Sequence, residues 1–307
     1  MNLEPKTYYS NGKLLITGEY LVLDGAKALA VPTKYGQSLI VSQNQNSKLK
    51  WKSFDERHSC WFESEFFMNA DGIIESENKS EISNRLTQIL NSAKNLNPNF
   101  LLDAIGFDVE SHLEFPRNWG LGSSSTLIQN LAQWANVNPY DLLNMTFGGS
   151  GYDIACASHQ GPLTYKLINQ DKRVISSVNF KPVFSEQLYF LHLNQKQNSR
   201  EGIAQYRANT ADKSKLIKEV NQITSAMINC ETLSEFQKLM NAHETLISGI
   251  IKQDRVEQKL FSDFEGGIKS LGAWGGDFVM VAHKTDPTDY FRLKGYETVI
   301  RYEDMVL

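Results

Sequence analysis

The residues that most clearly suggest chemistry are 120–126, which read Gly-Leu-Gly-Ser-Ser-Ser-Thr and precede an apolar segment typical of a helix. Glycine lets a backbone approach a ligand closely and adopt positive φ, and successive backbone N–H groups can form a cradle for an anion. A helix that begins at the serines adds unpaired N–H groups and the positive end of its dipole. The pattern therefore predicts a phosphate site, where serine hydroxyls can reach a Mg²⁺ ion shared with the phosphates.

The same residues also have a simpler interpretation, a glycine turn followed by a serine that caps a helix. Two other nucleotide-binding motifs do not fit. A Walker A loop ends in Gly-Lys-Ser/Thr, and this segment has no lysine. A Rossmann fingerprint has a third glycine where Ser125 stands, and an acidic residue that ends the next strand about 20 residues later. Asp141 lies near that distance, but it follows Pro139 in a helical context.

A second candidate is Asp153, which follows the glycine-rich segment Gly148-Gly149-Ser150-Gly151. A carboxylate just after such a turn can approach a reacting hydroxyl without obstruction, and it can accept the proton of that hydroxyl or orient it. The alternative is that Asp153 caps the next helix.

A third candidate is Lys13, which follows Gly12 on an early strand, with Gly18-Glu19 close behind. Its ammonium could neutralise a phosphate or pair with Asp153, and pairing would lower the pKa of the carboxyl. The alternative is a solvated lysine at the start of a strand.

A fourth motif, Gly272-Ala-Trp-Gly-Gly-Asp277, precedes an apolar strand. Glycine-rich turns before strands often serve only as tight connections, and Asp277 could be an ordinary turn residue. Alone, this motif predicts a turn.

In order and combination, the four motifs resemble those of the GHMP kinases, the family of galactokinase, homoserine kinase, mevalonate kinase and phosphomevalonate kinase. That family has a lysine-bearing first motif, a Pro-x-x-x-Gly-Leu-Gly-Ser-Ser loop, a Ser-Gly-x-Asp segment and a late glycine-rich motif. The chain shows, in the same order, Gly12-Lys13 with Gly18-Glu19-Tyr20, Pro116 to Ser124, Ser150 to Asp153, and Gly272 to Asp277. The resemblance covers nearly the whole chain, and the Gly-Leu-Gly-Ser-Ser loop is its most specific part.

The resemblance implies an α+β enzyme of two domains with ATP between them, a ribosomal-S5-like N-terminal domain (1–183) and a ferredoxin-like C-terminal domain (184–307). Asp153 would act on the acceptor hydroxyl, and Lys13 would lie beside it. The ATP phosphates would be held by Gly120, Leu121, Gly122, Ser123, Ser124 and Ser125, and Ser124 would also contribute to Mg²⁺ binding. The acceptor substrate would lie near Glu19, Ser150, Gly151, Gly275 and Gly276.

For the acceptor, Gly-Glu-Tyr and Gly-Gly-Asp look most like phosphomevalonate kinase, since mevalonate kinases usually have Gly-Glu-His. The string Gly151-Tyr-Asp-Ile-Ala155 also looks like the short bacterial GHMP kinases grouped by that motif. We expect ATP-dependent phosphorylation of a small anionic metabolite, phosphomevalonate or mevalonate of the isoprenoid precursor pathway, with a sugar or an amino-acid hydroxyl as alternatives. Ser199, Arg200 and Arg117 could contact the anion, although Ser199 and Arg200 would equally suit a solvated loop.

Two positions depart from the family pattern. Mevalonate kinases have a metal-binding Glu about eleven residues before the catalytic Asp, and here Leu142 stands at that place beside Asp141. We therefore expect fewer protein ligands for Mg²⁺. Trp274 replaces a small residue of the late motif. The missing Glu keeps open a catalytically inactive sensor of ATP and a metabolite, and a dinucleotide-dependent oxidoreductase is a weaker alternative.

Hydrophobic periodicity places helices over 81–94, 123–135, 212–228, 233–251, 258–271 and 287–293, and another that begins near residue 139. Strands are expected over 38–41, 49–53, 105–113, 187–193, 278–282 and 297–301, and 13–23 suits a strand, a turn and a second extended or helical piece. A domain boundary is expected near 180–186.

Composition limits the class of protein. The 307 residues suit one large domain or two ordinary ones, and 41% hydrophobic residues suffice for a full core. A net charge of −4 argues against a nucleic-acid partner, so an anionic substrate must be held by a few placed cations. The three distant cysteines suit reduced thiols in the cytoplasm. We expect no membrane partner, a small-molecule substrate, and a monomer or homodimer.

Overall fold

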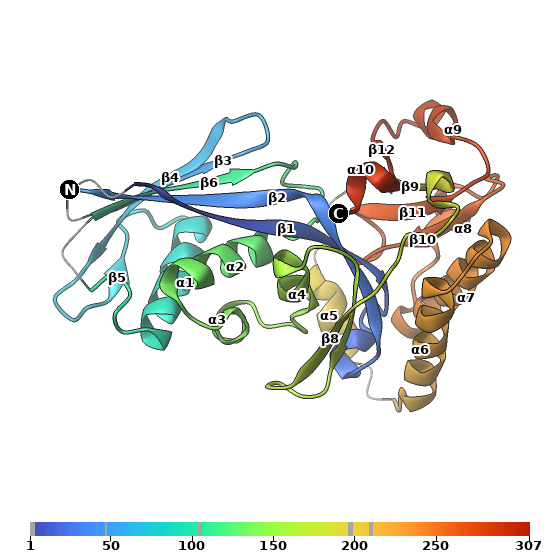
Figure 1. The fold of residues 1–307 in the computed structure, drawn as a ribbon, viewed down its shortest axis with the longest axis horizontal. Helices are drawn as coiled ribbons and strands as arrows, with labels where there is room; N and C mark the ends of the chain where they lie inside the picture. The colour runs from blue at the N-terminus through green and yellow to red at the C-terminus, as the bar shows by residue number, and fades with distance from the viewer. Residues whose placement is uncertain (1–3, 47, 103–105, 196–198, 209–210) are drawn as a thin grey trace. The chain divides into compact units, whose positions relative to one another are not determined.

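The structure, a computed structural model, describes residues 4–46, 48–102, 106–195, 199–208 and 211–307. It is of the α+β class, with one mixed sheet and a second, antiparallel sheet. The chain packs into two compact units. Figure 1 labels most of its helices and strands. Unit 1 comprises 1–12, 35–117 and 122–158, and unit 2 comprises 13–34, 118–121 and 159–307. Packing rather than sequence order defines these units, so the expected boundary at 183/184 stays a prediction.

Unit 1 contains most of the mixed sheet, in the order β5-β4-β3-β6-β2, with β1 paired to β2. Strand β3 runs parallel to β6, and the other registered pairs are antiparallel. The long strands β1 and β2 each contribute residues to both units. The bounds are β1 Lys6–Thr17, β2 Ala28–Asn44, β3 Leu49–Phe54, β4 Cys60–Met68, β5 Ile74–Glu75 and β6 Gly106–Leu113.

The helices of unit 1 cover one face of this sheet (Figure 1). Helix α1 begins where the Ser80 hydroxyl accepts the Ser83 N–H, and its residues Leu86, Ile89 and Leu90 are buried against the strands. Ile128 and Leu131 of α2 join the same core. The bounds are α1 Glu81–Leu96, α2 Ser123–Ala135, α3 Pro139–Thr146 and α4 Tyr152–Ser158.

Unit 2 contains a second sheet of four antiparallel strands in the order β10-β11-β9-β12. The helices α5 to α8 join β9 to β10, and α9 joins β11 to β12, so the connectivity is that of a ferredoxin-like β-α-β-β-α-β unit. This confirms the ferredoxin-like C-terminal part. The bounds are β9 Leu188–His192, α6 Ser214–Ile228, α7 Leu233–Ile251, β10 Gly267–Ser270, β11 Phe278–Ala282, α9 Thr288–Leu293 and β12 Val299–Arg301.

The remaining elements of unit 2 surround this sheet or extend the mixed one. Strand β7 pairs with the beginning of β2 and with β8. A short 3₁₀ helix follows β1 and packs in a cluster with residues of α6 and α7. The bounds are η1 Leu21–Asp24, β7 Leu163–Leu167, β8 Arg173–Ser177, η2 Ser185–Gln187, α5 Ser199–Ala208, α8 Val256–Leu260 and α10 Tyr302–Met305.

Most of the expected elements are confirmed, several of them to the residue, but the helix expected over 258–271 is wrong. Helix α8 ends at Leu260, and the strand β10 then runs from Gly267 to Ser270. Every residue of β10 is buried. Pairing with β11 fixes this segment as a strand, and that pairing is a tertiary contact invisible to local periodicity. No helix in the described ranges combines the length and apolar character that crossing a bilayer requires.

Candidate functional site

The N-terminus of α2 is built as the sequence predicts for an anion site. Its N-cap is Gly122, which has φ 90° and no side chain to occupy the first N–H groups of the helix. Thr126 donates its own N–H to the Gly122 carbonyl, which closes the first turn. The earlier N–H groups of α2 are thus arranged at the positive end of the helix dipole, where a phosphate binds well.

The serines at the start of α2 have different environments. Ser124 is exposed, whereas Ser125 is buried and its hydroxyl donates to the Gly122 carbonyl at 2.8 Å. Of these two hydroxyls, that of Ser124 is therefore the better placed to meet a ligand. Ser125 can offer a ligand its backbone N–H, while its side chain stabilises the turn. The alternative of a serine N-cap does not hold, because the N-cap residue is Gly122.

Asp153 is the second residue of α4 and is partly exposed. Asp153 Oδ1 accepts the Ile154 N–H at 3.2 Å. Because α4 begins at Tyr152, Asp153 lies in its first turn and is not its N-cap. Ser150 and Gly151 precede α4 directly, Ser150 partly exposed and Gly151 buried. A catalytic role for Asp153 stays a prediction.

In unit 2, Lys13 bonds through two of its atoms to Gly120 and Leu121, the first two residues of the Gly-Leu-Gly loop (120–125). Its ammonium donates to the Gly120 carbonyl oxygen at 2.8 Å, and its backbone N–H donates to the Leu121 carbonyl oxygen at 2.9 Å. Lys13 is partly buried, so the solvated lysine proposed as the alternative is not what the structure shows. A cation is thus fixed on this loop two residues before the α2 N-cap.

The carboxylate of Asp277 lies against Gly120 in the same unit. A Cβ atom on Gly120 would come within 2.3 Å of both Cγ and Oδ2 of Asp277, and Gly120 has φ 65°. Both facts require glycine at this position. Asp277 is held by its own backbone, since its N–H donates to Gln195 O at 2.6 Å and its carbonyl accepts the Leu193 N–H at 2.8 Å. Asp277 is therefore more than a turn residue, because its side chain packs on the loop that Lys13 contacts.

The late glycine loop (272–277) connects β10 to β11 and has an unusual backbone. Gly272 and Gly275 have positive φ, and so do Trp274 and Asp277 at 55° and 52°. The Trp274 side chain is buried in a cluster with Tyr20 and Tyr206. Gly275 is partly exposed and Gly276 is buried. A bulky residue therefore anchors the loop where the resemblance implies a small one.

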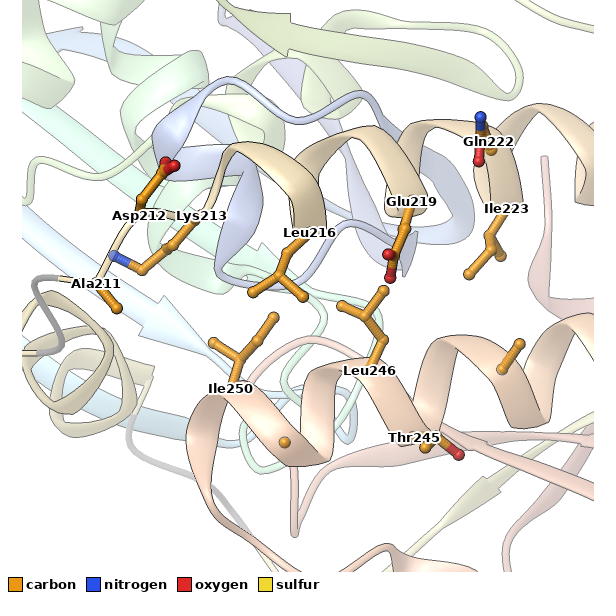
Figure 2. A pocket seen from close by; sticks show the side chains of 12 residues that line it. Ala211, Asp212, Lys213, Leu216, Glu219, Gln222, Ile223, Thr245, Leu246 and Ile250 are labelled. Atoms are coloured by element: carbon orange, nitrogen blue, oxygen red, sulfur yellow. The ribbon is translucent and has the colours of Figure 1, made fainter.

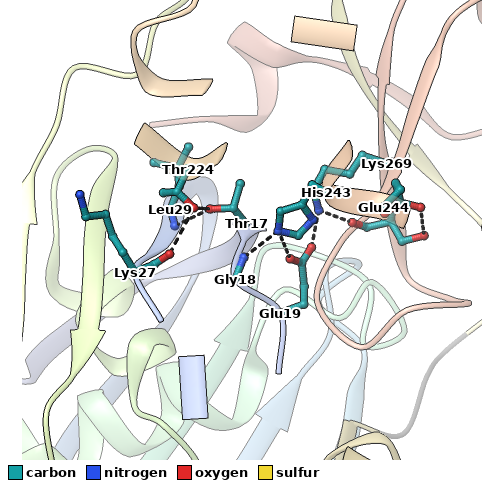
Figure 3. A network of polar contacts seen from close by, with 10 residues as sticks. Thr17, Gly18, Glu19, Lys27, Leu29, Thr224, His243, Glu244 and Lys269 are labelled. Carbon is teal, nitrogen blue, oxygen red and sulfur yellow. Dashed lines mark hydrogen bonds and ion pairs between the residues drawn. The ribbon is translucent and has the colours of Figure 1, made fainter. Parts of the chain in front are cut away.

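Glu19 is fully buried in a polar network of unit 2, drawn in Figure 3. The Lys269 ammonium donates to Glu19 Oε1 at 2.5 Å and to the Ser270 carbonyl at 2.8 Å. Burial raises the pKa of the Glu19 carboxyl, and the Lys269 charge opposes that shift. Because Glu19 has no accessible surface, its placement argues against the direct substrate contact expected from the resemblance.

Two more titratable groups complete this network. His243 Nε2 accepts the Gly18 N–H at 3.0 Å, which makes Nδ1 the protonated nitrogen of a neutral ring. Burial lowers the pKa of His243 far below its usual value, and the nearby Lys269 charge adds to that effect. Glu244 accepts the Ser270 N–H at 3.0 Å, and burial raises its pKa to about 8. Glu19 therefore contacts both Lys269 and His243, whose Nε2 atom lies 3.3 Å from Glu19 Oε2, and burial favours the neutral forms of His243 and Glu244.

Sequence reasoning missed Lys269, His243 and Glu244. The only local signal for Lys269 was a lysine inside an apolar stretch, three residues before the late glycine loop. Ser199 and Arg200 begin α5, but their side chains lie outside what the structure describes, and so does the segment 196–198. Lys13 and Asp153 belong to different units, so their pairing also stays a prediction.

The candidate metal ligands are few. Within the described residues, no group of three or more His, Cys, Asp or Glu side chains could hold a metal ion. Leu142, at the place of the family's metal-binding Glu, is fully buried in the core of unit 1, and its neighbour Asp141 is exposed. The exposed Ser124 hydroxyl is a protein oxygen that could reach a Mg²⁺ ion bound with a nucleotide at the α2 N-terminus.

A cavity of 650 Å³ lies elsewhere in unit 2, between α6 and α7 (Figure 2). Its lining is largely apolar, with Leu216, Ile223, Leu246 and Ile250 among its residues and Asp212 at one end. None of the site residues expected from the sequence lines it.

Comparison with solved structures shows the same fold in several small-molecule kinases. The mevalonate kinase of Methanococcus jannaschii has a TM-score of 0.70 at 16% identity, over 96% of each chain. Phosphomevalonate kinase of Streptococcus pneumoniae, solved with phosphomevalonate and AMPPNP, has 0.69 at 15%, over 96% of this chain and 99% of that one. Galactokinase of Lactococcus lactis, complexed with galactose, has 0.63 at 18%, over 95% and 88%. No protein-family model and no curated sequence matches the chain. The GHMP kinase fold expected from the motifs is confirmed.

Proposed function

We propose that this chain is an ATP-dependent small-molecule kinase that transfers the γ-phosphoryl group of ATP to a small anionic metabolite. The observation that carries the proposal is the bond from the Lys13 ammonium to the Gly120 carbonyl, because it fixes a cation on the loop that leads into the uncapped N-terminus of α2. The likeness of fold to mevalonate, phosphomevalonate and galactose kinases supports the same interpretation.

In this proposal the N–H groups at the start of α2 and the Ser124 hydroxyl bind the ATP phosphates. Lys13 offsets the negative charge that develops during transfer. The acceptor oxygen forms a bond to the γ-phosphorus, the bond from that phosphorus to the β,γ-bridging oxygen breaks, and ADP leaves. Asp153 orients the acceptor and takes its proton when the acceptor is a hydroxyl. Mg²⁺, when bound with ATP, neutralises phosphate charge.

For the acceptor we propose phosphomevalonate or mevalonate. The Gly-Glu-Tyr and Gly-Gly-Asp strings support this choice, and a neighbour in fold was solved with phosphomevalonate bound. A sugar is the second candidate, because the galactokinase of the same fold was solved with galactose. The hydroxyl of an amino acid is a third candidate acceptor, supported only by the family resemblance. We further propose that the protein works in the cytoplasm as a monomer or homodimer.

A non-catalytic sensor of ATP and a metabolite is the alternative function. The burial of Leu142 at the place of the metal-binding Glu favours it, because it leaves Mg²⁺ with few protein ligands. The ammonium of Lys13, which is held on Gly120 of the Gly-Leu-Gly loop, favours the kinase.

The test is a coupled ATPase assay with Mg-ATP against mevalonate, phosphomevalonate, galactose, homoserine and related sugars. The kinase proposal predicts turnover with one acceptor, which Asp153→Asn removes. Asp141→Asn is the matched control, because Asp141 is an exposed carboxylate in the first turn of the nearby helix α3. ATP binding without turnover of any acceptor would favour the sensor, and an absence of ATP binding would refute both.

A further inference from the structure

Glu19 and Tyr20, two consecutive residues of the first motif, reach two different points of the late glycine loop and its approach. The Glu19 carboxylate pairs with Lys269, in the strand β10 that leads into the loop. The Tyr20 hydroxyl donates to the carbonyl of Ala273, inside the loop, at 2.9 Å. One turn of the chain therefore contacts both the base of the loop and its interior.

The ion pair at the base is fully enclosed. The side chains of Glu19 and Lys269 have no exposed surface, and the Lys269 ammonium also donates to the Ser270 carbonyl. Ser270 in turn is held by Glu244, which accepts both its N–H and its hydroxyl. A buried charge pair with such additional bonds has little freedom to shift, because separating the two groups would leave each charge buried without this partner.

The contact of Tyr20 inside the loop is equally constrained. Tyr20 has φ 61° and a buried side chain that stacks on Tyr206 of α5, with ring centroids 5.6 Å apart. A Cβ atom on Gly202 of the same helix would come within 2.3 Å of the Tyr20 hydroxyl oxygen. The ring therefore lies between α5 and the late glycine loop and can move toward neither.

The late glycine loop needs such support because of its own backbone. Trp274 and Asp277 both have positive φ, which a side-chain-bearing residue keeps only when its surroundings enforce it. At its end, the loop presents the Asp277 carboxylate to Gly120. Gly120 is the residue whose carbonyl accepts the Lys13 ammonium.

We propose that Glu19, Lys269 and Tyr20 are positioning residues that clamp the late glycine loop and so hold Asp277 against the Gly-Leu-Gly loop in the arrangement that phosphoryl transfer requires. The clamp acts through Ala273 at one point and through β10 at the other. This inference rests on the proposed kinase function, and it assigns Glu19 and Tyr20 a role through other residues and not a contact with substrate.

The first test measures the clamp without reference to activity. Tyr20→Phe removes the hydroxyl that holds Ala273 and keeps the ring that stacks on Tyr206. We expect amide hydrogen exchange in the peptide 271–278 to become at least about tenfold faster. Tyr290→Phe is the matched control, since it also removes a tyrosine hydroxyl bond, to Asp263 at 2.8 Å, on a different element of unit 2. Unchanged exchange in Tyr20→Phe would overturn the proposal.

The second test measures the consequence for turnover. Misalignment of the loop affects the transition state more than ground-state binding, so Tyr20→Phe should lower kcat about tenfold and leave the KM for ATP within about twofold. The double variant Glu19→Gln/Lys269→Met removes the ion pair without leaving a buried charge, and it should show the same loss of kcat while remaining folded by circular dichroism. Tyr290→Phe should retain wild-type kcat.

The possible results distinguish a failure of the clamp from a failure of the proposed kinase function. Faster exchange together with unchanged kcat in both clamp variants would reduce these residues to a purely structural role and overturn the proposal. If the wild-type chain binds no Mg-ATP and turns over no acceptor, the proposed function fails and the catalytic role of the clamp fails with it. The exchange measurement would in that case still decide whether the physical clamp exists.

Discussion

Replacing Gly120 by alanine should disturb the loop for two separable reasons. Gly120 has φ 65°, a left-handed conformation that costs an alanine about 1–2 kcal/mol. The new Cβ atom would also lie 2.3 Å from the Asp277 carboxyl, which is closer than atoms can pack. Relieving such an overlap in a packed site typically costs about 1–3 kcal/mol. We therefore expect Gly120→Ala to lower the free energy of unfolding by about 2–5 kcal/mol.

Gly148→Ala is the matched control for this prediction. Gly148 also has φ 65°, but a Cβ atom there would meet no atom within 4 Å. Both variants therefore carry the same backbone strain, and only Gly120→Ala carries the overlap with Asp277. The difference between them should be about 1–3 kcal/mol, which corresponds to roughly 2–4 °C of melting temperature per kcal/mol in a domain of 150–250 residues.

Thermal unfolding of the two variants, followed by calorimetry, measures this difference. The double variant Gly120→Ala/Asp277→Ala removes the carboxyl that the Cβ atom meets, so it should melt close to Gly148→Ala after correction for Asp277→Ala alone. Equal losses of stability in Gly120→Ala and Gly148→Ala would refute the packing of Asp277 on the Gly-Leu-Gly loop.

Three other perturbations follow from the buried side chains. The folded chain keeps a proton on Glu244 up to about pH 8, whereas the unfolded chain releases it near the ordinary pKa of 4.5. As the pH rises from 4.5 to 8, the free energy of unfolding should therefore fall by up to about 1.4 kcal/mol per pH unit. Urea titrations at several pH values should show this slope, and Glu244→Gln should remove it. Lys269→Met leaves the Glu19 charge buried and should cost about 3–5 kcal/mol of unfolding free energy, most of which Glu19→Gln should restore in the double variant. Ser125→Ala should cost about 1 kcal/mol through its buried hydroxyl, whereas the exposed Ser124→Ala should leave stability within about 0.5 kcal/mol and weaken Mg-ATP binding in calorimetric titration.

The parts of the fold that the sequence predicts well are those set by local patterns. Helix α2 has the expected bounds because Gly122 directly precedes it and the apolar periodicity lies within its own residues. The strand β10 was predicted as helix because its four buried residues show no alternation, and their partners in β11 follow an intervening loop. Strand pairing of this kind is a non-local contact, which periodicity does not contain.

The candidate site also has residues that local patterns predict and residues that only the folded chain brings together. Lys13, Gly120 and Ser124 belong to recognisable motifs, so their types and spacing already suggest a phosphate site. Glu19 was predicted beside the substrate from the resemblance of its motif to that of the GHMP kinases. Its partner Lys269 lies 250 positions away, and only the folded chain brings the two together. The lysine inside an apolar stretch marks Lys269 as unusual, but neither local segment specifies its partner.

The decisive measurement of phosphoryl transfer mixes the protein with Mg²⁺, each candidate acceptor and ATP labelled at the γ-phosphate. We expect a labelled product with one acceptor, phosphomevalonate or mevalonate first, which is lost in Asp153→Asn and retained in Asp141→Asn. A chain that binds no ATP and yields no labelled product with any acceptor would refute the proposed kinase activity.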